Sequence, residues 1–199
     1  MADLVAVRPS PRAIELGLQR SSGWWGMIFV IATEAAVFAY LLFSYYYMAI
    51  EIHPTWPSNP PSLKLALPNT IILLASSVAI WWGERQFGRA RQTEALTAVS
   101  LAGVLGLVFL AVQLLEWHNK TFTIASDPYG SLYFTITGFH MAHVVAGLLI
   151  IAALIAWMAG GLLSDRRRIA LSIGALYWHF VDAVWLTVFF TFYITPYLS

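Results

Sequence analysis

The chain alternates long apolar runs with short polar segments. A helix needs about 20 mostly apolar residues to cross roughly 30 Å of hydrocarbon. Five runs of this length lie between charged segments, at residues 24–47, 68–87, 95–117, 129–158 and 169–194, and Pro68 stands where the first residue of a helix is expected. The pattern predicts an all-α, polytopic membrane protein. Its single domain, residues 24–199, is a bundle of five transmembrane helices that follows a polar tail, residues 1–23.

The positive charges gather in every second polar segment. Arginines occur three at a time in the tail and in the second-to-third and fourth-to-fifth connections, whereas the other two connections hold only Lys64 and Lys120. Because lysine and arginine beside a span are retained in the cytoplasm, this alternation predicts an internal amino terminus and an external carboxyl terminus. The tail lacks the apolar core of a cleaved signal peptide, so we expect it to remain as a cytoplasmic segment.

Two local patterns bear on how the helices are connected and packed. The longest connection, residues 48–67, contains four prolines and is expected to be an extended outer loop. Small residues let helix backbones approach closely within a membrane. They recur at every fourth position in three of the runs, as Ala75, Ala79 and Gly83, as Ala98, Ala102 and Gly106, and as Gly138, Ala142 and Ala146.

Composition narrows the class of protein. Hydrophobic residues make up 59% of the 199 residues and charged residues 11%, against roughly 45–50% and about 25% in soluble domains. The formal net charge of +1 is too small for the basic surface that nucleic-acid binding requires, so membrane lipids are expected partners and nucleic acid is not. The absence of cysteine excludes disulfides, thiolate zinc or iron–sulfur sites and cysteine-bridged copper from this chain.

Two carboxylates lie deep within their predicted spans. Glu34 is about 15 Å beyond Trp24, and Asp182 is about 20 Å beyond Ile169, at 1.5 Å per helical residue. A charge near the bilayer midplane costs at least about 2.5 to 3.5 kcal/mol, so such groups are expected to be protonated, paired or turned toward protein or water. His179 precedes Asp182 by three residues, on the same helix face, which predicts that the two side chains satisfy each other.

Other polar pairs show the same spacing of three residues. His140 and His143 lie near the middle of the fourth run, and Gln113 and Glu116 lie near the end of the third. Facing histidines could ligate a haem iron, which leaves a stand-alone b-type cytochrome as one alternative. A di-iron site is not favoured, because it would need two Glu-x-x-His motifs and the sequence has none.

We interpret most of these groups as hydrogen-bonding contacts between helices. The expected structural set is His140, His143, His179, Asp182, Gln113 and Glu116. Glu34 is the candidate for a proton-handling role, because it is an acid within the membrane with no charged neighbour in its own run. No metal ligand is assigned.

Several motifs, taken together and in order, resemble subunit III of the haem-copper respiratory oxidases. They are IATEAAVFAYLLFSYYY (residues 31–47), PNTIILLASS (68–77), QLLEW (113–117), YGSLYFTITGFHMAHVVAG (129–147) and YWHFVDAVWL (177–186). The first carries the family's intramembrane glutamate at Glu34, and the fourth its paired histidines. The family's long form has seven helices, so this chain resembles the five-helix bacterial form, as in cytochrome c oxidase subunit 3.

The resemblance implies a particular set of partners and cofactors. The subunit would bind no haem or copper, would pack on oxidase subunit I, and would support proton uptake and durability of the catalytic subunit, with Glu34 near the entry region for protons. It would have no catalytic centre of its own. Haem and copper would belong to subunits I and II, electrons would come from cytochrome c, and phospholipid is a possible ligand. The expected location is the bacterial plasma membrane.

Two alternative assignments, both close to this one, stay open. One is the same subunit in a quinol oxidase, and the other is the homologous accessory protein of nitric oxide reductases. Quinol oxidases often have aspartate at the position of Glu34, so the glutamate favours cytochrome c as electron donor.

Overall fold

A computed structural model describes residues 22–52, 56, 63–162 and 168–197. These residues form long helices and no strands: α2 (Ser22–Ile52), α3 (Leu63–Gly88), α4 (Gln92–His118), α5 (Pro128–Ala159) and α6 (Arg168–Phe189). A π-helix, Phe190–Ile194, and a 3₁₀ turn, Thr195–Tyr197, follow α6. Five helices are long and apolar enough to cross a membrane, which confirms the predicted all-α, five-helix fold. The predicted tail lies almost wholly outside the described residues, as do Arg166 and Arg167.

Local sequence explains the start of α5. The Oδ1 atom of Asp127 accepts a hydrogen bond from the backbone N–H of Gly130 at 2.6 Å. Pro128 follows as the first helical residue, where an N–H would have no partner within the helix. An aspartate cap followed by proline therefore fixes this helix end.

Helix ends around the long connection differ from the expectations. Pro68 lies inside α3, because the apolar stretch from Leu63 onward has already begun the helix. α2 extends to Ile52. Both ends of the segment expected to be a loop, residues 48–67, are therefore helical.

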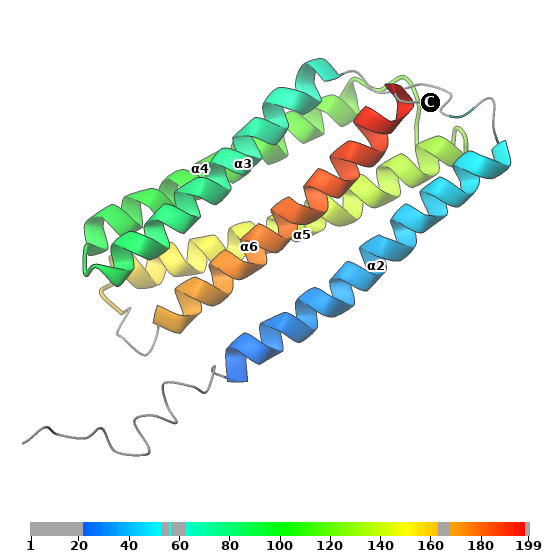
Figure 1. The fold of residues 1–199 in the computed structure, drawn as a ribbon. Helices are drawn as coiled ribbons and strands as arrows, with labels where there is room; N and C mark the ends of the chain where they lie inside the picture. Colours follow the sequence, from blue (N-terminus) through cyan, green and yellow to red (C-terminus); the bar gives the residue numbers. More distant parts are fainter. Residues whose placement is uncertain (1–21, 53–55, 57–62, 163–167, 198–199) are drawn as a thin grey trace, which may run out of the picture.

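The helices form a bundle in which α2 lies at one edge (Figure 1). α3 makes its most extensive contacts with α4, and α6 contacts α2, α3 and α5. α2 packs mainly on α5 and α6, and only Phe38 and Tyr45 are buried along it. Large apolar side chains are exposed along the rest of α2, among them Phe29, Val30, Tyr40, Phe43 and Ile50.

Trp178 of α6 contacts residues of three other helices. Its indole is fully buried and donates a hydrogen bond from Nε1 to the Oγ of Ser76 in α3 at 2.9 Å. Gly106 of α4 and Gly147 of α5 lie against the ring so closely that a Cβ at either position would come within 2.7 Å of it. The two glycines thus make room for a tryptophan that holds α3, α4, α5 and α6 together.

The small-residue patterns contribute unequally to this packing. Ala98, Ala102 and Gly106 are all buried, and a Cβ added at Gly83 would lie 3.2 Å from Ala98. These contacts account for the close α3–α4 pairing. Ala75 and Ala142 are exposed, because the helix rotation turns those positions away from the neighbouring helices.

Candidate functional site

Glu34 and His143 form a polar contact between α2 and α5. The Oε2 atom of Glu34 lies 3.1 Å from Nε2 of His143. Phe38, one turn further along α2, packs edge-on against the same imidazole with ring centroids 5.1 Å apart. The Glu34 side chain is 37% exposed and that of His143 14%, so the pair lies at the surface of this chain at mid-helix depth.

The other ring nitrogen of His143 limits where the proton of this pair can be. Nδ1 lies 2.7 Å from the carbonyl oxygen of Phe139, and a carbonyl only accepts, so Nδ1 carries hydrogen. A neutral ring then has a lone pair on Nε2. The contact with Glu34 is a hydrogen bond only when the pair holds one further proton, either on the carboxyl or on Nε2. Glu34 and His143 together are thus suited to hold one proton within the membrane.

His140 faces away from this pair, although it is only three residues from His143. It is fully buried, and neither ring nitrogen has a hydrogen-bond partner among the described residues. Its ring lies on Trp185 with centroids 4.9 Å apart and meets Phe109 edge-on at 6.0 Å. The two histidines therefore belong to different surroundings, one in the core and one beside α2.

The predicted bond between His179 and Asp182 is wrong. Nδ1 of His179 instead lies 2.5 Å from the Oγ of Ser77 in α3. Asp182 is buried, and neither of its carboxyl oxygens has a hydrogen-bond partner in the described part of the chain. The spacing of three residues predicted both side chains on one helix face, but the hydrogen-bond partner of His179 is a serine on the neighbouring helix.

Glu116 is the centre of a second polar cluster, which is buried near the end of α4. Its Oε1 accepts hydrogen bonds from Lys120 Nζ at 2.8 Å, from the hydroxyl of Tyr193 at 2.7 Å and from that of Tyr133 at 3.4 Å. The two tyrosine hydroxyls are 3.0 Å apart. The ammonium of Lys120 also lies 5.0 Å from the centre of the Tyr133 ring. One carboxylate thus links α4, α5 and the π-helix.

The sequence marked only part of these clusters. Glu34, His143, Glu116 and Gln113 were singled out, and Gln113 is fully buried without a hydrogen-bond partner in the described chain. The partners Ser77, Lys120, Tyr133 and Tyr193 were not. The usable signals were depth within a span, for Glu34 and His143, and the spacing of three residues, for Gln113 and Glu116. Neither signal shows that Glu34 and His143, 109 residues apart in the sequence, lie together.

Metal ligation has little support in the described residues, where no group of three or more histidine, aspartate or glutamate side chains is placed to hold an ion.

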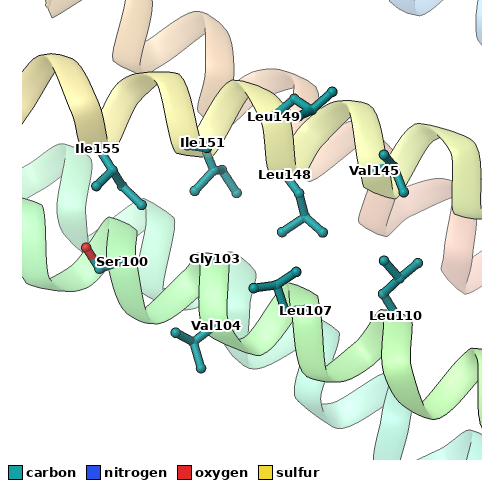
Figure 2. A pocket seen from close by; sticks show the side chains of 11 residues that line it. Ser100, Gly103, Val104, Leu107, Leu110, Val145, Leu148, Leu149, Ile151 and Ile155 are labelled. Carbon is teal, nitrogen blue, oxygen red and sulfur yellow. The ribbon is translucent and has the colours of Figure 1, made fainter.

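An apolar pocket of about 490 Å³ lies between α4 and α5. Figure 2 shows Leu148 and Ile151 of α5 pointing toward Gly103 and Leu107 of α4. Ser100 is the polar side chain of the lining, so the pocket suits hydrocarbon rather than a charged ligand.

Comparison with known proteins points to one family. A family model described as cytochrome c oxidase subunit III matches residues 13–197. The chain is 34% identical over 177 residues to cytochrome c oxidase subunit 3 of Petromyzon marinus, which covers 85% of this chain and 68% of the relative. The corresponding protein of Struthio camelus is 33% identical over 177 residues, with 85% and 68% covered. That of Locusta migratoria is 34% identical over 179 residues, with 85% and 67% covered.

The match covers nearly the whole chain, including all five helices and the residues of both polar clusters. The chain therefore belongs to the cytochrome c oxidase subunit III family, a subunit of terminal oxidases of the cytochrome c oxidase type.

Proposed function

We propose that this subunit packs on catalytic subunit I through the α2 face and supports proton uptake there, with the Glu34–His143 pair as its proton-holding group. The observation that carries the proposal is the 3.1 Å contact between these two side chains. The pair can hold one proton, lies at mid-membrane depth and is partly open at the surface of the chain. A proton-handling group that faces a partner needs each of these three properties.

The surroundings of the pair favour a protein partner over lipid. An ionisable group that faces hydrocarbon is costly, and Glu34 is 37% exposed in this chain. α2 also leaves large apolar side chains uncovered, and helices in membranes associate by close packing of such surfaces. A neighbouring subunit on this face would bury both features.

The wider assignment follows from the family. The chain would hold no catalytic centre, haem or copper, which would belong to subunits I and II of an oxygen-reducing, proton-pumping complex with cytochrome c as electron donor. The bacterial plasma membrane is the proposed location, with the amino terminus inside, as the arginine distribution predicts. The names of the relatives favour cytochrome c over quinol.

Purification in mild detergent tests the assembly. We expect an affinity tag on this chain to recover a haem-copper subunit I together with a subunit II that contains a cysteine-ligated copper site. Recovery of a quinol-type subunit II would correct the electron donor, and recovery of a nitric oxide reductase would replace the oxidase. A stoichiometric haem absorption band in the isolated chain would contradict the metal-free assignment and favour the b-type cytochrome.

The variant Glu34→Gln tests the proton role separately from structure. The glutamine amide can donate a hydrogen bond to a neutral Nε2 of His143, so the link between α2 and α5 persists. The titratable carboxyl group is lost. We expect normal assembly with slower proton uptake or faster inactivation during turnover. Glu51→Gln, an exposed acid at the end of the same helix, is the matched control. Pumping and turnover lifetime equal to those of wild type would make Glu34 a structural residue.

A further inference from the structure

Tyr177 of α6 carries a phenol that lies beside the Glu34–His143 pair. Its side chain is buried, with 6% exposure, and its hydroxyl lies 3.5 Å from the backbone carbonyl oxygen of His143. The phenol and the Glu34 carboxyl also interact electrostatically. The three helices α2, α5 and α6 therefore each bring one titratable side chain to this part of the molecule.

The close approach of α5 and α6 places this phenol. A Cβ added at Gly147, one turn beyond His143 on α5, would lie 3.5 Å from Cε1 of Tyr177. The same Cβ would lie 2.7 Å from the ring of Trp178, which is fixed on its other side by the hydrogen bond to Ser76. Helix packing around Trp178 therefore holds Tyr177 against α5.

The hydroxyl of Tyr177 is held only weakly where it lies. A distance of 3.5 Å is long for a hydrogen bond between two oxygen atoms, which is usually about 2.7 to 2.8 Å. The hydroxyl of Tyr193, by comparison, donates to Glu116 at 2.7 Å. A buried tyrosine hydroxyl normally finds a good partner, so that of Tyr177 is available to a stronger acceptor nearby.

The charged form of Glu34 is such an acceptor. While Nε2 of His143 carries the proton of the pair, the imidazolium donates to Oε2 of Glu34 across their 3.1 Å contact. After that proton has left, Nε2 and the carboxylate are both acceptors only. Two acceptors that face each other repel, and neither then stabilises the negative charge. The pair needs a donor from a third group at this stage.

We propose that Tyr177 is a positioning residue of the pair, and that its hydroxyl donates a hydrogen bond to the Glu34 carboxylate, directly or through one water, once the proton has left. A hydrogen bond to the charged form of a carboxyl group favours that form. Tyr177 would thereby assist release of the proton and keep the carboxylate turned toward α5 and α6. This inference rests on the proposed proton role of Glu34 and adds a third group to the same site.

Infrared difference spectroscopy of the intact oxidase tests the inference. The C=O stretching band of protonated Glu34 is identified as the band that Glu34→Gln removes. Tyr177→Phe keeps the ring and loses only the hydroxyl. We expect it to raise the ratio of protonated to ionised Glu34 roughly tenfold at the same pH, which is the effect of one hydrogen bond to a charged group. Assembly should be normal and proton uptake slower.

Tyr46→Phe is the matched control. Tyr46 lies further along the same helix as Glu34, and its hydroxyl is 3.1 Å from Oγ1 of Thr191. The variant therefore also removes one tyrosine hydroxyl from a contact between helices, but away from the pair. Its Glu34 band should equal that of wild type. An unchanged Glu34 band in Tyr177→Phe, or an equal change in both variants, would overturn the inference.

Failure of this inference is distinguishable from failure of the proposed function. Proton uptake and turnover lifetime equal to those of wild type in Glu34→Gln would contradict the proposed function, although the effect of Tyr177 on the Glu34 band could still be measured. Impaired uptake in Glu34→Gln together with an unchanged Glu34 band in Tyr177→Phe would contradict the role of Tyr177 alone.

Discussion

Glu116 and Lys120 form an ion pair whose two side chains are almost hidden from solvent, 5% and 11% exposed. A similar pair lies at the other end of α4, where Arg91 and Glu94 are 59% and 44% exposed. Removal of one partner from a buried pair leaves an unpaired charge in a medium of low dielectric constant. An exposed pair is screened by water and contributes little. The two ends of one helix thus offer a matched comparison.

We predict that Lys120→Met destabilises the complex by about 3 to 5 kcal/mol, because Glu116 keeps its charge but loses its cation. Arg91→Met should cost no more than about 1 kcal/mol. Thermal unfolding of the two purified variant complexes measures the difference. Equal midpoints would show that Tyr133 and Tyr193 suffice to stabilise the carboxylate.

A second comparison of single residues concerns the hydrogen bonds of Asp182 and His179. The sequence alone predicted that Asp182 and His179 satisfy each other. In the structure His179 bonds to Ser77, whereas the carboxyl oxygens of Asp182 have no hydrogen-bond partner in the described chain. We now predict that Asp182→Asn leaves stability unchanged or raises it, and that Ser77→Ala lowers it by about 1 kcal/mol. Denaturation midpoints with the opposite order would contradict these contacts.

Among the helices, the packing around Trp178 decides how closely α4, α5 and α6 approach. A Cβ at Gly106 would lie 2.7 Å from the indole and 2.9 Å from Leu148, distances that force the helices apart. A Cβ at Gly138 on α5 would lie 3.5 Å from Trp117, which is ordinary contact. Glycine is required at the first position by close approach and is not required at the second.

We predict that Gly106→Ala destabilises the subunit by about 1 to 3 kcal/mol through overpacking. Gly138→Ala should be neutral or slightly stabilising, because alanine favours the helix more than glycine does. Thermal stability of the assembled complex distinguishes the two. A neutral Gly106→Ala would mean that Trp178 can shift within the core.

For the whole molecule, the direction of the chain across the membrane is the main property open to direct measurement. The native sequence has no cysteine, so one introduced thiol reports its own side without background from this subunit. Gln92 and Asn119 are exposed and lie at opposite ends of α4. They are suitable positions for such a label.

We predict that Asn119→Cys reacts with a membrane-impermeant maleimide in intact cells, and that Gln92→Cys reacts only after permeabilisation. The reason is the arginine excess beside α3 and α4, which is retained in the cytoplasm. Mass spectrometry of the isolated subunit measures the labelling. The reverse labelling pattern would invert the proposed topology. An inverted topology would leave the contact between Glu34 and His143 unaffected.

Hydropathy and charge along the chain predicted the number of spans, and five sequence motifs carried the resemblance to the family, without reference to any tertiary contact. Hydrophobic burial in a bilayer is summed over about 20 neighbouring residues, so it is a local property that a sequence displays directly. The helix cap at Asp127 is also local, because its hydrogen bond joins residues three positions apart. The candidate residues Glu34, His143 and Glu116 were found because an acid or histidine inside an apolar run is costly wherever it lies.

The choice of partners was decided only by the tertiary structure. Whether His179 meets Asp182 or Ser77, and whether His143 faces His140 or Glu34, depends on how each helix is rotated and how closely it approaches its neighbours. Those quantities are set by contacts such as Trp178 against Gly106 and Gly147, which join residues far apart in the chain. The sequence by itself determined which groups must be satisfied within the membrane, because that cost is local. Helix packing determined which groups satisfy them, because a hydrogen bond requires atoms within about 3 Å of each other.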